Sequence, residues 1–128
     1  MILPDVNVLV RAHNADSAVH ERAKLWWDAC LSGTEGIGLA WATMLGFLRI
    51  TESWLALPHV HIAQPSDTHF ERLRAELERL GTAGNLTTDT HLAVLAIERG
   101  YILHSTDTDF ARFRGLRWVN PCQETPRS

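Results

Sequence analysis

Of the chain's 128 residues, 45% are hydrophobic and 21% are charged, and the formal net charge is −3. This composition excludes an intrinsically disordered chain, and the length predicts a single domain, 1–128, with residues 122–128 as a loose tail. No apolar stretch reaches the ~18 residues of a membrane span and no signal peptide opens the chain, so we expect a cytoplasmic protein with no membrane partner. Cys30 and Cys122 match no zinc-binding spacing and are expected to be free thiols.

Strand-like and helix-like segments alternate along the first half of the chain. In order, the pattern predicts a strand at 1–3, helices at 4–14 and 17–32, a strand at 36–41, a helix at about 42–55 and a strand at 59–63. Ser17 is a candidate N-cap of the second helix, and Gly33 is its candidate stop.

The second half continues the alternation. It predicts a charged helix at 67–80 capped by Ser66, a loop at 82–87, a helix at 88–99 ended by Gly100, a strand at 101–105, a short helix through 110–113 and a final strand near 116–120. Strands that alternate with helices predict the α/β fold class, with a parallel sheet covered on both faces. In such sheets, ligands bind outside the carboxyl ends of the strands.

Acidic residues occur at several of these expected element ends. Asp5 directly follows the first strand, and Asp107 and Asp109 follow the strand at 101–105. Asp89 opens the helix at 88–99, and the residues three, four and seven positions later are all apolar. Asp89 therefore shares the buried face of its helix, which directs the carboxylate toward a cleft over the sheet.

Each of these aspartates also has a purely structural explanation, because aspartate is a favoured N-cap and helix N-termini attract negative charge. Four carboxylates at element ends, with no lysine nearby, favour one acidic cluster. A cap and a ligand are compatible roles at a place where a strand leads into a helix.

An acidic cluster is costly without a counterion, because like charges raise each other's pKa. Oxygen ligands suit hard divalent cations, so we expect Mg²⁺, with Mn²⁺ as the substitute. A site of this kind can activate water and hydrolyse a phosphodiester bond.

Four segments, in this order, resemble the PIN-domain family, and in particular the VapC-type toxins of bacterial toxin–antitoxin pairs. They are "PDVNVLVRA", "GFLRI", "TDTHLAVLAIERG" and "LHSTDTDFARFRGLRWVNP". The resemblance extends from Ile2 to about Pro121. It implies a three-layer α/β/α sandwich around a parallel sheet. It also implies a Mg²⁺-dependent endoribonuclease that acts on tRNA or rRNA and is silenced by a cognate antitoxin protein.

The resemblance also implies roles for individual residues. Asp5, Asp89, Asp107 and Asp109 would be the metal-binding and catalytic carboxylates. Asn7 would support the site by hydrogen bonding, and Thr106 matches the family's small hydroxyl residue before the last aspartate pair.

One position departs from the family pattern. Many members carry a glutamate three residues before the arginine of the central helix, and this chain has Gly46 there. Glu52 is a weak substitute, since a residue six positions away lies nearly opposite on a helix. The number of metal ions, one or two, therefore stays open.

Several surface residues indicate partners. Arg49, Arg112 and Arg114 are candidates for phosphate contacts near the cleft. Trp26 and Trp27 are adjacent in a predicted helix, so their side chains cannot both point to the same side, which favours a homodimer or antitoxin surface for one of them.

Two other functions stay open: a catalytically weakened PIN-like module that binds RNA or protein, and a different Mg²⁺-dependent phosphotransfer enzyme. The second would need an aspartate nucleophile with a lysine partner, and Lys24 lies on an outer helix.

Overall fold

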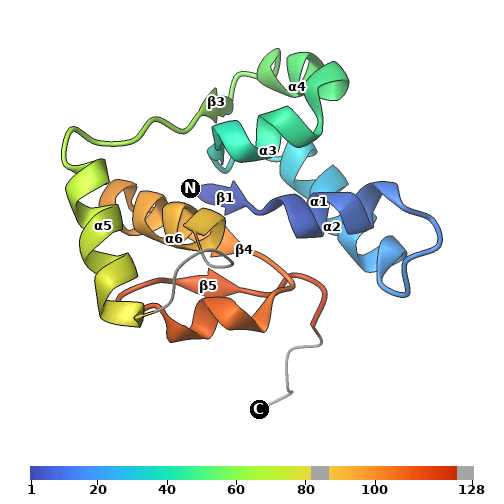
Figure 1. Cartoon of the computed structure of the whole chain (residues 1–128). Coiled ribbons are helices and arrows are strands. Elements are labelled where there is room, and N and C mark those ends of the chain that lie inside the picture. Colours follow the sequence, from blue (N-terminus) through green and yellow to red (C-terminus); the bar gives the residue numbers. More distant parts are fainter. Residues whose placement is uncertain (82–86, 124–128) are drawn as a thin grey trace.

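The chain folds around a five-stranded sheet in the order β3-β2-β1-β4-β5, in which all neighbouring strands are parallel (Figure 1). The computed structural model describes residues 1–81 and 87–123. The strands are β1 (Ile2–Pro4), β2 (Ile37–Leu39), β3 (Val60–Ile62), β4 (Ile102–His104) and β5 (Trp118–Val119). The predicted α/β class with a parallel sheet is confirmed.

Helices connect the strands and cover the sheet. They are α1 (Val6–His13), α2 (His20–Ser32), α3 (Trp41–Gly46), α4 (Leu48–Leu55), α5 (His69–Leu80), α6 (Thr87–Arg99) and the 3₁₀ helix η1 (Thr108–Arg112). None of the helices in the described ranges is long and apolar enough to cross a membrane.

Two hydrophobic cores lie on the two faces of the sheet. Adjacent residues of β1 point to opposite faces, so Ile2 packs in one core with Leu9 and Trp27, and Leu3 packs in the other with Leu92. The first core is covered by α1 and α2, and the second by α6. This is the three-layer arrangement that the family resemblance implies.

A buried polar network joins the start of α5 to the end of α6. The carboxylate of Glu98 accepts hydrogen bonds from the backbone N–H of Ser66 (3.0 Å) and from its hydroxyl (2.9 Å). His69 Nδ1 lies 2.7 Å from the same carboxylate, and His69 Nε2 lies 2.8 Å from His91 Nδ1. These contacts hold α5 against α6.

Three predicted helix boundaries are wrong. The helix expected at about 42–55 is two helices, because Phe47 leaves the helical conformation (φ −135°, ψ 38°) and packs its ring near Trp54. α2 begins at His20 with Val19 as N-cap, since the Ser17 hydroxyl accepts from the N–H of Val19 in a preceding turn. α5 begins at His69, because Ser66 is engaged by Glu98 instead of capping the helix.

Other expectations are confirmed. Gly33 caps α2 and Gly100 follows α6 with a positive φ of 75°, a conformation that glycine adopts at low cost. Both cysteines are free and buried. Cys122, which was expected in a loose tail, is instead packed in the first core. The predicted loop at 82–86 and the tail at 124–128 lie outside the described residues.

Gly38 supplies a stability test. Its position in β2 lies against the ring of Tyr101, where an added Cβ would be 2.5 Å from Cε1. Gly38→Ala must displace this ring and is expected to lower the free energy of unfolding by about 1–3 kcal/mol in denaturant titrations. Gly36→Ala is the control, because its Cβ would meet the flexible side chain of Met1. Equal losses in both variants would contradict the packing argument.

Candidate functional site

The sheet has a topological switch point between β1 and β4. From the central strand β1 the chain first builds β2 and β3 on one side, and later β4 and β5 on the other. In doubly wound sheets, ligands bind at the carboxyl ends of the strands at such a point. Asp5 follows β1 and Asp107 follows β4, so the two residues lie on opposite sides of this crevice.

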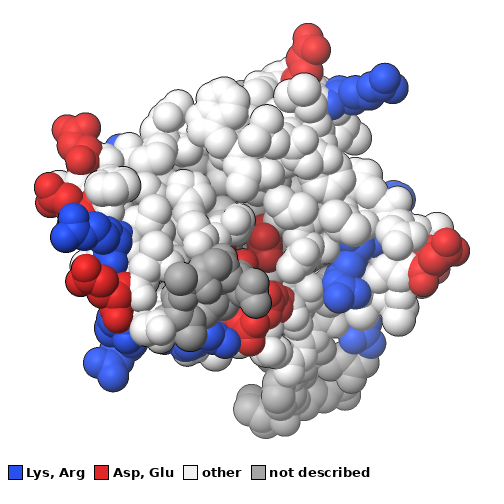
Figure 2. Space-filling model, in the orientation of Figure 1, with Lys and Arg blue, Asp and Glu red and all other residues white. Residues whose placement is uncertain are grey.

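Three of the four predicted carboxylates meet there. Asp89 is in the first turn of α6, Asp107 is the N-cap of η1 and Asp109 lies in the first turn of η1. One oxygen from each lies within 4.8 Å of the others, and we name this set the carboxylate trio. Acidic surface is visible near the centre of the face in Figure 2, where β1, β4 and α6 meet.

Asp107 combines two roles, as the sequence predicts. Its side chain accepts a hydrogen bond from the N–H of Asp109 (2.9 Å), which caps η1. The same carboxylate still offers an oxygen to the trio.

Asp5 lies beside the trio and is 5% exposed. Its Oδ2 accepts a hydrogen bond from the hydroxyl of Ser105 at 2.8 Å. The backbone N–H groups of Val6 and Asn7 favour its charged form. The support that was predicted from Asn7 thus comes in part from its backbone N–H group, and its side chain is exposed.

Ser105 is the site residue that the sequence reasoning missed. It is fully buried, and its Oγ also accepts the N–H of Asp107 at 3.0 Å, so it links both sides of the crevice. Thr106 was predicted for a supporting role near the aspartates, but its hydroxyl instead accepts from Arg11 Nε at 3.1 Å. The useful signal lies in the pairing of Leu3 with Leu103, because Asp5 and Ser105 each follow two residues later on the same face.

Burial and mutual repulsion raise the pKa of two site carboxyls. Burial raises the pKa of Asp89 to about 6, and the charges of Asp107, Asp5 and Asp109 add to the rise. Burial also raises the pKa of Asp5, with a further contribution from Asp107, against the opposing hydrogen bond from Ser105. The site therefore concentrates negative charge, which disfavours the ionised forms of Asp5 and Asp89.

Arg112 is the predicted arginine that reaches the site. It pairs with Asp109 at 3.2 Å, and its charge opposes the rise in the pKa of Asp89. Arg49 is exposed in the first turn of α4, and Arg114 is exposed beyond η1. Within residues 1–81 and 87–123, no ion pair or hydrogen bond joins these two arginines to the trio.

The position of the missing glutamate lies close to the site. Gly46 is the last residue of α3, and a Cβ there would lie 3.7 Å from Cγ1 of Val6, which directly follows Asp5. This is ordinary van der Waals contact, so a side chain fits. Glu52 is exposed on α4 and does not belong to the trio.

The tryptophan pair does not provide the open surface that the sequence suggested. Trp27 is 2% exposed and belongs to the core. Trp26 is half-buried and stacks on His104, with ring centroids 5.4 Å apart.

The donor set fits a hard divalent cation. All three ligand atoms of the trio are carboxylate oxygens, which Mg²⁺ and Mn²⁺ prefer. The pKa of Asp89 is raised although the charge of Arg112 opposes the rise, and a bound cation would further favour the ionised form.

Comparisons with known proteins agree with this architecture. The chain is 37% identical to Ribonuclease VapC33 of Mycobacterium tuberculosis (strain ATCC 25618 / H37Rv), over 97% of this chain and 100% of that protein. No family model matches the chain.

Solved structures show the same fold. The structure of M. tuberculosis VapC20, described as a sarcin-ricin loop cleaving toxin, aligns with a TM-score of 0.64 at 17% identity, over 91% of this chain and 99% of that one. A toxin–antitoxin complex from Klebsiella pneumoniae aligns with a TM-score of 0.65 at 19% identity, over 94% and 98%. The fold is that of PIN-domain proteins. By its identity to VapC33 over nearly the full length, the chain belongs to the VapC ribonuclease family.

The raised pKa of Asp89 predicts a pH-dependent stability effect in the cation-free protein. The folded chain binds an extra proton between the ordinary pKa of 3.8 and the folded value of about 6. The cost of ionising Asp89 is therefore absent below about pH 4 and complete above about pH 6. Asp89→Asn should unfold at a higher temperature than the wild type at pH 7 in chelator, and this advantage should vanish toward pH 4.

Thermal unfolding of both proteins across this range provides the measurement. Burial lowers the pKa of His104 to about 4, which acts with the opposite sign but equally in both proteins, so the contribution of His104 cancels in their difference. Asp16→Asn, at an exposed aspartate between α1 and α2, should show no such difference. An advantage of Asp89→Asn that does not change with pH would contradict the prediction.

Proposed function

We propose that the chain is an endoribonuclease toxin that hydrolyses RNA phosphodiester bonds with Mg²⁺, or Mn²⁺ in its place, and that an antitoxin protein silences it. The main support for this proposal is the carboxylate trio at the switch point of the sheet. In addition, the relative to which the chain is 37% identical is named a ribonuclease. tRNA and rRNA are the proposed substrate classes.

Asp89, Asp107 and Asp109 would hold the cation, with Asp5 beside them as a direct or water-mediated ligand. A bound divalent cation supplies Lewis-acid chemistry, since it lowers the pKa of water and stabilises charge on phosphate oxygens. Ser105 keeps Asp5 in place by donating its proton to Oδ2. Because Ser105 Oγ accepts from the N–H of Asp107, the same group sets the spacing between the two aspartates.

Arginines would hold the substrate's phosphates. Arg112 is fixed by Asp109 at the rim of the trio and is best placed for this role. Arg49 and Arg114 are proposed contacts at a greater distance. Asn7 would support the site through its backbone N–H group near Asp5, and Thr106 through the hydrogen bond that it accepts from Arg11.

Exposed apolar side chains on α3 and α4 support a protein partner. Trp41, Leu45 and Leu48 are 53%, 70% and 69% exposed, which is unusual for large apolar residues on neighbouring helices. A structural relative is a toxin–antitoxin complex, and we propose an antitoxin as the partner of this chain. Homodimerisation stays a prediction.

Loss of the acidic residues tests the proposed chemistry. Asp5→Asn and Asp89→Asn should each reduce Mg²⁺-dependent RNA cleavage by at least about 100-fold, because each removes negative charge from the cation site. RNA cleavage is followed on gels with purified protein, and circular dichroism verifies that the variants fold. Asp16→Asn should cleave as the wild type does. Full cleavage by both site variants would refute the proposal.

Gly46 keeps a second function open, namely a module that binds RNA or protein without cutting. A competent site should be stabilised against thermal unfolding by millimolar Mg²⁺, because the ion binds the folded chain preferentially. If Mg²⁺ produces neither a thermal shift nor cleavage, the binding module is the better description.

Restoring the missing carboxylate tests the importance of Gly46. Gly46→Glu places an acid beside Val6, where the structure has room for a side chain. We expect the Mg²⁺ concentration for half-maximal cleavage to fall by roughly tenfold, since one more carboxylate adds about 1.4 kcal/mol to cation binding. Gly46→Gln is the uncharged control. Equal Mg²⁺ dependence in the Glu and Gln variants would show that this position lies outside the cation's reach.

A further inference from the structure

A basic groove lies between α5 and α6, at some distance from the acidic crevice. Its volume is about 380 Å³, and Arg72, Arg79 and Arg114 line it. Val94 and Ile97 of α6 form an apolar part of its lining, and Ile97 is 41% exposed. None of the groove residues on α5 and α6 belongs to the carboxylate trio.

The sequence of α5 builds one wall of this groove. Arg72, Glu76 and Arg79 are four and three residues apart, so they share one face of the helix. Arg79 pairs with Glu76, whereas Arg72 and Arg114 form no ion pair within the described parts of the chain. Three guanidinium groups against one carboxylate leave a surplus of positive charge.

Two of the groove arginines, Arg72 and Arg79, donate hydrogen bonds to neutral acceptors. Arg72 Nε donates to Thr68 Oγ1 at 3.2 Å, which leaves the other N–H groups of its guanidinium for a ligand. Arg79 donates to the backbone carbonyl of Arg112 at 3.3 Å. Ordered arginines lose less side-chain entropy when they bind a phosphate.

The groove is connected to the carboxylate trio. The carbonyl that Arg79 contacts belongs to Arg112, whose side chain pairs with Asp109. Val94 and Ile97 are five and eight residues after Asp89 on the same helix, which corresponds to about 7 to 12 Å along its axis. A nucleic-acid strand with a rise of about 3.4 Å per nucleotide covers this distance with roughly two to four nucleotides.

We infer that this groove binds the sugar–phosphate backbone of the RNA strand, a few nucleotides away from the bond that is cut. The inference rests on the proposed function and adds a second contact region to it. Arginine forks match phosphate oxygens, and the apolar residues between them offer a surface for sugars and bases. Contacts of this kind contribute affinity and register but do not read the sequence.

Charge and position together favour RNA over an acidic peptide. The acidic peptide would find the same arginines, but nothing would require it to continue toward the trio. An RNA strand with its scissile phosphate at the trio must cross adjacent surface, and the groove supplies positive charge there.

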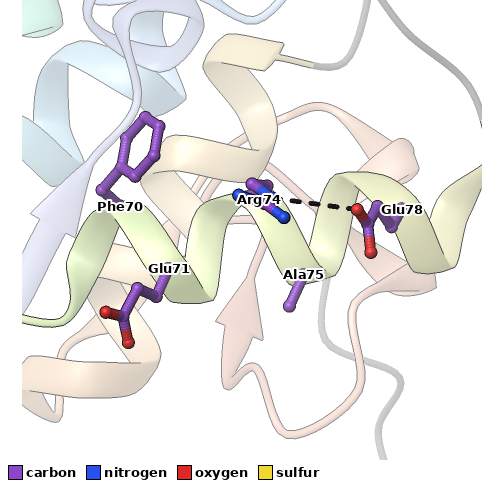
Figure 3. A pocket seen from close by; sticks show the side chains of 5 residues that line it. All are labelled: Phe70, Glu71, Arg74, Ala75 and Glu78. Atoms are coloured by element: carbon purple, nitrogen blue, oxygen red, sulfur yellow. Dashed lines mark ion pairs between the residues drawn. The ribbon is translucent and has the colours of Figure 1, made fainter.

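The test compares a groove variant with a control variant on another face of α5. Arg72→Gln/Arg114→Gln removes two groove charges, and Arg74→Gln removes one charge from the neighbouring surface pocket, where Arg74 pairs with Glu78 at 3.8 Å (Figure 3). All variants carry Asp89→Asn, so that the RNA stays intact. Fluorescence anisotropy with a labelled single-stranded RNA measures Kd over a series of salt concentrations without divalent cations.

We expect the groove variant to bind RNA roughly tenfold more weakly at 0.1 M salt, and the slope of log K against log salt to decrease by about 1.4, or about 0.7 for each lost phosphate contact. Arg74→Gln should stay within about twofold of its parent, since it loses no contact of this kind. Thermal unfolding should be unchanged in both, because these side chains are exposed.

RNA binding by the groove variant with the parent's affinity and salt slope would overturn the inference. If the same variant also loses binding to a glutamate-rich peptide, the groove is assigned to a protein partner instead. Cleavage assays with the natural protein, in which Asp89 is intact, separate failure of the groove assignment from failure of the proposed function. If the natural protein cuts RNA while the groove variant binds normally, only the groove assignment fails. If the groove variant loses RNA affinity but the natural protein does not cut, only the nuclease assignment fails.

Discussion

The hydroxyl group of Ser105 is the contact on which the candidate site depends. It donates to Asp5 and accepts from the N–H of Asp107, so one oxygen holds the ends of β1 and β4 at a fixed spacing. The sheet delivers both partners to this point, because the N–H of Asp5 still donates to the carbonyl of His104. A buried hydrogen bond to a charged acceptor contributes about 1.5–3 kcal/mol, which is enough to select one orientation of the Asp5 side chain.

The rest of the site works against folding. The trio and Asp5 bring negative charges together in a partly buried crevice, and burial and repulsion raise the pKa of Asp5 and Asp89. The start of η1 does not require this arrangement, since a single cap by Asp107 would suffice for it. A cluster that costs stability and matches the preferences of a divalent cation is what a functional constraint produces.

The sequence predicted the parallel sheet and the acidic site because both depend on local patterns. The phase of α6 places Asp89 above buried Leu92 and Ala93, and the aspartates after β1 and β4 follow from the rule for parallel sheets. The errors have tertiary causes. Ser66 looks like a cap for α5, but Glu98, 32 residues later, takes both of its donors. Ser105 was missed because its partner is 100 residues away and is found only when the register of β1 and β4 is known.

The charge around the crevice is distributed unevenly. The four carboxylates lie directly after β1, at the start of η1 and in α6, whereas α3 ends at Gly46 and carries no carboxylate. The basic groove lies on the same side as the trio, joined to it through Arg112. In the proposed binding mode, the strand is therefore held by arginines on α5 while it crosses toward carboxylates that repel it.

This separation divides the work between two sets of residues. Arginine contacts supply affinity without touching the reacting bond, so they stabilise the bound substrate and the transition state equally. The carboxylates supply no affinity for RNA by themselves and would become favourable for RNA binding through the cation that we propose they hold. A strand anchored a few nucleotides away can tolerate a weakly bound cation, because the scissile phosphate is already in place and can contribute oxygen ligands of its own. In this proposal, the basic groove and the missing carboxylate at Gly46 are two parts of one arrangement, in which substrate binding compensates for a cation site with one carboxylate fewer.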